Sequence, residues 1–210
     1  RMNNKESIAE FVGIMLGDGN LGIYKSRVGN KIKLQHRVRV SLDSRNIGYT
    51  NHVVCILREV LGFEPRVSYK KTENGVDVGI YRKDCFLYVL EKIGLKKSPK
   101  WNNMEIPIPY RKGKLSLLVM KGLFDTDGCL SIFNNNGIIY PRIEIRLCPS
   151  PAQKQINEIL EIYGFRHKIQ QLERGKTRIR ISGNSQLRRW FDLIGSSNPI
   201  HMKKSIKFVE

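Results

Sequence analysis

One short pattern, an apolar segment that ends in Asp-Gly, occurs twice in this chain of 210 residues. The first copy spans Phe11–Gly19 and the second spans Met120–Gly128, and each copy has a glycine at its third position. The spacing of the apolar residues predicts a helix in both copies. The carboxyl end of a helix carries partial negative charge, so two helices that end at Asp18 and Asp127 and meet there would gather four negative groups. Such an arrangement requires a compensating positive charge, and a divalent metal ion is the obvious candidate.

The charge balance points to a polyanionic partner. Lys and Arg number 37 against 19 Asp and Glu, a formal charge of +18, and a hydrophobic fraction of 40% is enough to build a core. A basic protein without a specific partner is the alternative. A membrane surface is disfavoured because no apolar run approaches the roughly 20 residues that span a bilayer. No secretory signal is visible, so we expect the cytoplasm or an organellar matrix and no secretion.

Cysteine and histidine do not suggest a zinc site. Cys55, Cys85, Cys129 and Cys148 form no Cys-x-x-Cys pair, and the four histidines are scattered along the chain. We expect the cysteines to be buried thiols in a reducing compartment.

The segment between residues 32 and 41 alternates almost perfectly, and it carries the strongest binding signal in the chain. Period 2 predicts a strand whose alternate residues lie on opposite faces of a sheet. One face is mostly apolar, and the other lacks any acid and carries Lys33, Gln35, Arg37, Arg39 and Ser41. Cations and amides of this kind suit phosphates and base edges. Nucleic acid is therefore the favoured partner.

The order helix, two strands, helix, two strands, helix occurs twice along the chain. We predict an α+β fold with one half-domain over residues 1–103, a linker over 104–114 and a second half-domain over 115–210. A duplication of this kind implies a pseudo-twofold axis. A DNA duplex is itself roughly two-fold symmetric, so such a protein can straddle it with each half on one half-site.

With both motif copies, both strand pairs and both lysine-bearing tails placed, the chain resembles the monomeric LAGLIDADG homing endonucleases over almost its whole length. The resemblance implies duplicated αββαββα half-domains whose two curved antiparallel sheets form a DNA-binding saddle. It also implies that the two motif helices pack together at the centre, where Gly13 and Gly122 would allow a close approach.

The resemblance implies a site-specific DNA endonuclease that acts as a monomer and needs no protein partner. It would hydrolyse one phosphodiester on each strand of a long, pseudo-palindromic double-stranded target and leave short 3′ overhangs. Asp18 and Asp127 would bind Mg²⁺, with Ca²⁺ or Mn²⁺ able to take its place, assisted by the backbone carbonyls of Gly17 and Thr126. A metal ion activates water and stabilises charge on the reacting oxygens, and hard oxygen ligands suit Mg²⁺.

The residues expected to contact DNA lie on the polar positions of the predicted strands. They are Lys25, Arg27, Lys33, Gln35, Arg37, Arg39, Ser41, Arg66, Ser68 and Lys70 in the first half, and Arg142, Glu144, Arg146, Lys168, Gln170, Arg178, Arg180 and Ser182 in the second.

A lysine pair follows each half, and these pairs are candidates for catalysis. Lys97 and Lys204 occupy repeated positions, with Lys96 and Lys203 as their neighbours. By analogy with the family, they would orient water and stabilise the transition state. Contact with the DNA backbone alone is an equally good interpretation.

Two departures from the family pattern stand out. The first motif has Leu16 where the consensus has its earlier Asp, whereas the second motif keeps Asp125. That position is not a metal ligand in the family, so activity is not put in doubt. Thr126 is bulkier than the usual small residue, which predicts asymmetric helix packing.

Two other functions remain open on the same fold: an RNA-binding intron maturase, and a DNA-binding protein that does not cleave. Intact Asp18 and Asp127 favour the nuclease, because without a metal ion two carboxylates repel phosphates. Whether the gene lies in an intron or an intein is also open.

Overall fold

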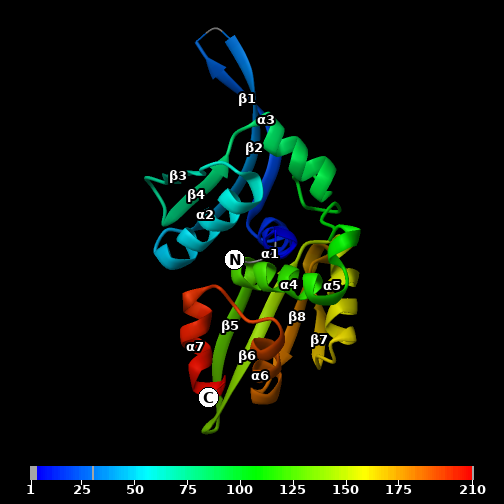
Figure 1. Ribbon diagram of the computed structural model, residues 1–210. Helices are drawn as coiled ribbons and strands as arrows, with labels where there is room; N and C mark the ends of the chain where they lie inside the picture. Colours follow the sequence, from blue (N-terminus) through cyan, green and yellow to red (C-terminus); the bar gives the residue numbers. More distant parts are fainter. Residues whose placement is uncertain (1–3, 30, 210) are drawn as a thin grey trace.

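Two half-domains, each built on a four-stranded antiparallel sheet, meet across a pair of helices in this computed structural model (Figure 1). The structure describes residues 4–29 and 31–209. Within these ranges no helix is both long enough and apolar enough to cross a bilayer.

The first half-domain follows the predicted order. Its elements are α1 (Asn4–Leu16), β1 (Gly19–Val28), β2 (Lys31–Asp43), α2 (Ile47–Leu61), β3 (Arg66–Tyr69), β4 (Gly75–Ile80) and α3 (Lys83–Leu87), which continues as a π-helical segment (Tyr88–Ile93). The strands are ordered β1-β2-β4-β3. On β2, Val38, Val40 and Leu42 are buried, as the alternation predicts.

The second half-domain repeats this arrangement. Its elements are α4 (Gly113–Asp127), β5 (Gly128–Asn135), β6 (Ile138–Leu147), α5 (Ala152–Ile162), β7 (His167–Gln171), β8 (Thr177–Ser182), α6 (Asn184–Leu193) and α7 (Pro199–Val209), with short 3₁₀ turns at Ile108–Tyr110 and Glu173–Gly175. The order β5-β6-β8-β7 matches that of the first sheet. The predicted fold class is confirmed, with α7 added where only a lysine-bearing tail was expected.

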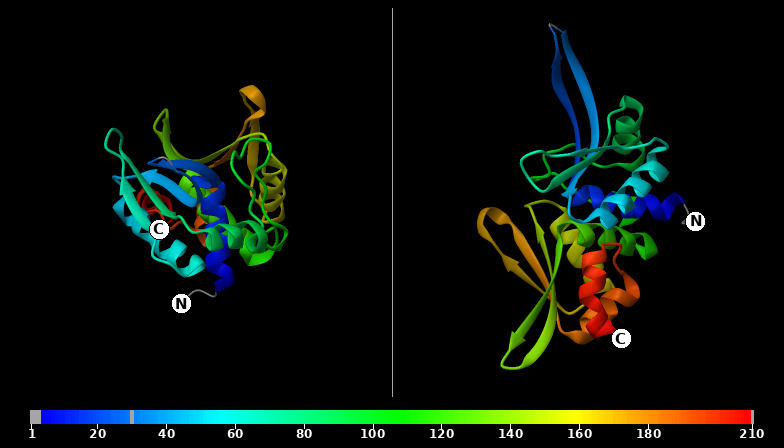
Figure 2. Two further views of the ribbon diagram at one scale, coloured as in Figure 1. Left: turned by 90° about the horizontal axis from the view of Figure 1, so that it is seen from above. Right: turned by 90° about the vertical axis from the view of Figure 1, so that its left-hand side faces the viewer.

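The strands of both half-domains lie along one side of the molecule, and most helices lie along the other (Figure 2, right). β2 pairs with β4 only over Val38–Asp43, while its earlier residues pair with β1 alone. The first two strands therefore project beyond their sheet as a two-stranded arm (Figure 1).

Helices α1 and α4 pack against each other at the centre, and glycines set their separation. A Cβ on Gly13 would clash with the carbonyl oxygen of Val119 and lie 2.8 Å from the amide nitrogen of Leu123. A Cβ on Gly122 would clash with the carbonyl oxygen of Glu10. As predicted, both positions need glycine because the two helix backbones touch there.

The segment predicted as a linker is part of the packed structure. Met104 and Ile106 are buried. The amide of Ile106 donates to Oε1 of Gln155 on α5 (2.8 Å), and the amide of Asn102 donates to the carbonyl of Pro149 (2.6 Å). The chain between the half-domains is thus fastened to the second one.

The four cysteines are free thiols, but they are not all buried. Cys85 is buried, as expected, whereas Cys55 and Cys129 are exposed. Cys55 points outward because it falls on the solvent side of α2, so the expectation of four buried thiols was wrong.

Candidate functional site

The carboxyl ends of α1 and α4 lie side by side. A Cβ on Gly17 would clash with the Thr126 side chain, whose hydroxyl donates to the carbonyls of Gly122 (2.9 Å) and Leu123 (3.1 Å). The predicted asymmetry is therefore present, with a threonine on one helix seated against a glycine on the other. This contact brings the ends that carry Asp18 and Asp127 together.

The two carboxylates influence each other. Burial, followed by the negative charge of Asp127, raises the pKa of Asp18 to about 6. Burial by surrounding protein also raises the pKa of Asp127, although its side chain is more open to solvent than that of Asp18. The positive charge of Lys100 opposes both shifts.

Lys100 is the lysine that the structure places at this site. Its Nζ donates a hydrogen bond to the carbonyl oxygen of Gly17. Its own carbonyl accepts hydrogen bonds from the amides of Asn103 (2.9 Å) and Met104 (2.8 Å) and from Sγ of Cys148 at the end of β6 (3.5 Å). Burial lowers the pKa of Lys100, while Asp127 and Asp18 oppose that shift. Lys100 is therefore anchored on one half-domain and reaches the other.

Of the two lysines predicted from repetition, Lys97 lines a small cavity together with Lys100, Leu16 and Gly19 beside the end of α1. Lys97 is exposed, and within the described ranges its side chain has no hydrogen bond or ion pair to Asp18 or Asp127. Lys204 on α7 donates to the carbonyl of Leu130 on β5 (3.1 Å). A catalytic role for either stays a prediction. The repeated Lys-Lys-Ser adopts different local structures, an irregular segment in the first half and a helix in the second.

The donor set suits a divalent ion held partly by its substrate. No group of three or more His, Cys, Asp or Glu able to hold a metal occurs in the described part of the chain. Two carboxylates beside two negative helix ends fit Mg²⁺, which is commonly bound through one or two carboxylates together with phosphate and water. The Gly17 carbonyl, a predicted ligand, already accepts the Lys100 hydrogen bond.

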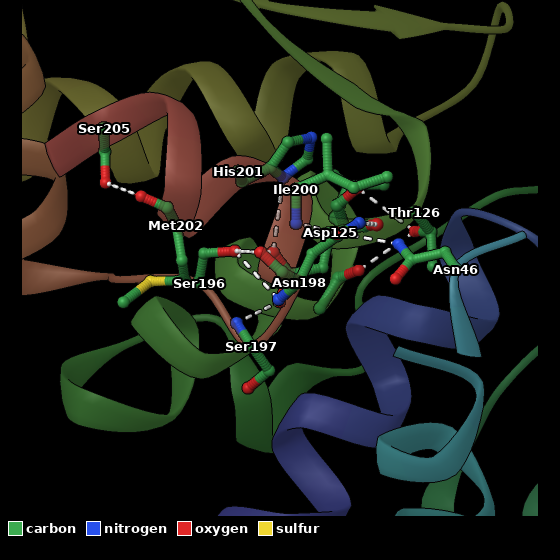
Figure 3. A network of polar contacts seen from close by, with 12 residues as sticks. Asn46, Asp125, Thr126, Ser196, Ser197, Asn198, Ile200, His201, Met202 and Ser205 are labelled. Atoms are coloured by element: carbon green, nitrogen blue, oxygen red, sulfur yellow. Dashed lines mark hydrogen bonds and ion pairs between the residues drawn. The ribbon is translucent and has the colours of Figure 1, made fainter. Parts of the chain in front are cut away.

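Asp125, two residues before Asp127, lies in a buried polar network (Figure 3). Its carboxylate accepts hydrogen bonds from the hydroxyl of Ser196 and from the amide of Ser197 (2.6 Å), and Nδ1 of His201 lies 3.5 Å from it. Its carbonyl accepts from Nδ2 of Asn198 (3.0 Å). The earlier Asp of the second motif therefore fastens the segment that leads into α7.

The same network joins the half-domains. Nδ2 of Asn46, at the start of α2, donates to Oδ1 of Asn198 (2.8 Å). The Ser197 hydroxyl donates to Glu10 (3.1 Å), a fully buried residue on α1. Glu10 also contacts Nε2 of His52 (2.7 Å) and Nζ of Lys121 (3.3 Å). Burial alone would raise the pKa of Glu10, but His52 and Lys121 outweigh it, so the pKa is lowered.

Strand register shows which predicted contact residues share a face in the first half. Arg39 of β2 lies beside Gly79, which pairs with Arg66, and Ser41 lies beside Asp77, which pairs with Ser68. These residues share the face of Lys33, Gln35 and Arg37, opposite the buried Val38 and Val40. Lys70 follows β3 and forms an ion pair with Glu73 (2.8 Å).

Lys25 and Arg27 lie on the other face of the arm. Lys25 pairs with Leu34 and Arg27 pairs with Ile32, so both lie on the face opposite to that of Arg37. Lys25 and Arg27 lie four and six residues after the buried Leu21, and residues an even number apart along a strand share the same side. The predicted contact set is therefore divided between two faces.

In the second half, all the predicted contact residues share one face. Register aligns Arg142 with Ser182, Glu144 with Arg180 and Lys168, and Arg146 with Arg178 and Gln170. A concave region on this face is lined by Arg142, Arg166, His167, Lys168, Arg180 and Ser182.

The residues on these faces that were missed from the sequence include an acid and two aromatic residues. Asp77 accepts hydrogen bonds from Nη1 of Arg39 (2.8 Å) and from the Ser41 hydroxyl (2.7 Å). Tyr24 and Phe133 each lie beneath an arginine. Strand alternation places all three side chains on the polar faces. An acid and two aromatic residues, however, do not match the cations and amides that were expected to contact DNA.

Three solved structures with the same fold are of nucleases bound to DNA. A LAGLIDADG homing endonuclease bound to its target DNA, I-LtrWI, matches with a TM-score of 0.68 at 10% identity, over 98% of this chain and 90% of that chain. I-DmoI in complex with DNA and Mn matches with a TM-score of 0.63 at 17% identity, over 92% and 98%. The meganuclease I-SmaMI bound to uncleaveable DNA matches with a TM-score of 0.60 at 12% identity, over 91% and 83%.

Sequence comparisons add no further match: no protein-family model and no curated protein matches the chain. The structural similarities show the fold, which is that of the LAGLIDADG homing endonucleases over almost the whole chain. The resemblance predicted from the two motif copies is confirmed at this level.

Proposed function

We propose that this chain, with its LAGLIDADG homing endonuclease fold, is a site-specific double-strand DNA endonuclease that uses a divalent metal ion. The observation that carries the proposal is the placement of Asp18 and Asp127 at adjacent helix ends, with the charge of Lys100 close to both. These helix ends lie between the two half-domains, whose sheets carry the basic faces (Figure 1).

The arrangement suits hydrolysis of a phosphodiester. Asp18 and Asp127 would hold the ion, which supplies activation of water and stabilisation of charge on the reacting oxygens. Lys100 holds its positive charge at Nζ beside both carboxylates, where it offsets their repulsion of a phosphate. Its hydrogen bond to Gly17 keeps that charge at the end of α1.

Duplex DNA is the substrate that the two faces support. Each face carries several arginines, and the formal charge of the chain is +18. Because one chain supplies both faces, a monomer can cover both halves of a target. The DNA-bound state of the matched structures supports this proposal. Mg²⁺ as the working ion and short 3′ overhangs as the products are the finer parts of the proposal.

Selection of cleaved sites from a randomised duplex library tests the proposal. With Mg²⁺ we expect a narrow set of long sequences cut on both strands, with short 3′ overhangs, and no cutting in EDTA. Duplex binding without any cleavage would overturn the nuclease in favour of a non-cleaving DNA-binding protein. Preference for structured RNA over duplex DNA would favour the maturase.

A further inference from the structure

An arginine on β2 lies over an aromatic ring. The guanidinium carbon of Arg37 lies 4.1 Å from the ring centre of Tyr24 on β1. Nη2 of Arg37 donates to Oε1 of Gln35, two residues earlier on the same strand (3.2 Å). The ring and the amide both contact the guanidinium and restrict its orientation.

The second half-domain contains the same three-residue unit. The guanidinium carbon of Arg142 on β6 lies 4.3 Å from the ring centre of Phe133 on β5. Nη2 of Arg142 donates to the hydroxyl of Tyr140, again two residues earlier (3.5 Å). The Phe133 and Tyr140 rings are themselves stacked, with their centres 5.7 Å apart.

Strand register shows that the two units occupy equivalent positions. Gly19, which follows Asp18, pairs with Val40, and Gly128, which follows Asp127, pairs with Ile145. Arg37 lies three residues before Val40, and Arg142 lies three residues before Ile145. The same count makes Tyr24 equivalent to Phe133 and Gln35 equivalent to Tyr140. The pseudo-twofold axis therefore relates the whole unit.

Both guanidinium groups carry Nη donors that can bind a ligand, and Nη1 of Arg142 also lies 3.9 Å from Oε1 of Glu144. Nε of Arg37 and Nε of Arg142 are buried and have no hydrogen-bond partner in the described part of the protein. Further hydrogen bonds must therefore come from the two Nη groups. Two parallel donors in a fixed plane match O6 and N7 of guanine in the major groove. A phosphate can accept the same pair of donors, so the binding selection described below is what separates a guanine contact from a phosphate contact.

The next position toward the sheet centre does not follow this symmetry. Arg39 in the first half is equivalent to Glu144 in the second by the same count. Arg39 pairs with Asp77 on β4 (2.8 Å), whereas Glu144 pairs with Arg180 on β8 (2.6 Å). The two sheet faces are therefore not identical at every equivalent position. The arginine units are matched at the position of Arg37 and Arg142, but not at the next one.

We propose that Arg37 and Arg142 each read a guanine, at two target positions that are equally distant from the centre and lie on opposite strands. This inference rests on the proposed function, because it requires a DNA duplex across both sheet faces. Tyr24 and Phe133 act as positioning residues that hold the two guanidinium planes.

A binding selection tests the inference without any need for cleavage. Randomised duplexes are selected in Ca²⁺ with the wild-type chain and with the variants Arg37→Lys and Arg142→Lys, which keep the charge but lose the planar pair of donors. We expect each variant to lose the guanine preference at one position, by about 5- to 150-fold, with the two positions at equal distances from the centre. The salt dependence of binding should stay close to that of the wild type, because the charge is unchanged.

The aromatic partners provide a second measurement. Tyr24→Phe keeps the ring and should keep the preference, whereas Tyr24→Ala should relax the same position as Arg37→Lys. Lys154→Ala removes one charge from an exposed site on α5 and serves as the off-face control. Thermal unfolding of each variant checks that its fold is intact.

Preserved preferences in both lysine variants would overturn the inference and assign the two arginines to phosphates. Positions lost at unequal distances from the centre would overturn it too. If the wild-type chain selects no duplex sequence, the proposed function fails together with the inference. If the wild type selects a site and the variants select the same one, only the inference fails.

Discussion

Lys100, from the segment that joins the half-domains, donates a hydrogen bond to the carbonyl oxygen of Gly17 at the carboxyl end of α1. Its main chain is fastened to Cys148 at the end of β6, so the lysine spans the seam between the half-domains. This one contact places a positive charge where two helix ends and two carboxylates would otherwise repel.

Replacing Lys100 with Gln should lower the rate of DNA cleavage by about two to four orders of magnitude, the usual range for a positioned proton-transferring or charged group. Target binding should change little, because many other cations contact the duplex. Single-turnover cleavage and equilibrium binding measure the two effects. A larger loss of rate in Lys97→Gln than in Lys100→Gln would contradict this prediction and favour Lys97 as the catalytic lysine.

Asp18 should make the metal-free protein less stable as pH rises. Its folded-state pKa is about 6 against an ordinary value of 3.8, so between these values the folded state binds more protons than the unfolded state. The free energy of unfolding should therefore fall from about pH 4 to about pH 6 and carry the full penalty above that range.

Asp18→Asn removes this penalty. In EDTA the variant should be more stable than the wild type at about pH 7.5, and the difference should vanish near about pH 4. Urea unfolding at both pH values measures it, and added Ca²⁺ should stabilise the wild type alone. An equal difference at the two pH values would show that Asp18 does not titrate as the structure indicates.

Gly13→Ala should lower the free energy of unfolding by about 1–3 kcal/mol or more, because its Cβ meets the backbone of α4 and not a movable side chain. Gly122→Ala should behave alike. Gly48→Ala is the matched control, since its Cβ meets only the ring of Pro199 at 3.0 Å. Denaturant unfolding of the three variants measures the effect, and equal stabilities would contradict the close approach of α1 and α4.

Glu10→Ala should destabilise the contact between the half-domains. Removal of one partner from a buried charge cluster costs about 3–5 kcal/mol, and because Lys121 and His52 keep some access to solvent we expect about 3 kcal/mol at neutral pH. Ser197→Ala, which removes one neutral donor, should cost about 1 kcal/mol.

The cost of Glu10→Ala should shrink in acid. The lowered pKa of Glu10 means that its stabilisation is present above the unfolded-state pKa and is lost as pH falls through the folded-state value. Unfolding measured across acidic and neutral pH tests this. A cost that does not change with pH would mean that packing, and not charge, holds Glu10 in place.

Much of the fold could be predicted because local signals agreed with one another. Alternation on β2, helical spacing on α1 and the repeated motif each specified an element, and duplication specified how the elements pair. Helix α7 was missed, although His201, Ser205 and Phe208 recur at helical spacing and are buried. The lysine pair Lys203-Lys204 lies between these buried residues, and it led to the prediction of a polar tail.

The site was predictable where it depends on a local pattern. Asp18 and Asp127 end two recognisable helices, so their meeting followed from the duplication. Lys100 was not predictable, because it lies in an irregular segment whose path is set by distant contacts such as the one from Asn102 to Pro149. The face of Lys25 could have been predicted, because alternation along the strand places it on the same side as the buried Leu21.

Cleavage and binding of a selected duplex by Asp127→Asn test the central claim most directly. The proposed nuclease predicts that the variant binds the duplex with nearly the wild-type affinity in Ca²⁺ but cuts neither strand in Mg²⁺, while the wild type cuts both. If the variant cleaves the duplex at the wild-type rate, Asp127 is not a metal ligand. Equal loss of binding and cleavage would make Asp127 a structural residue and leave the account without its catalytic centre.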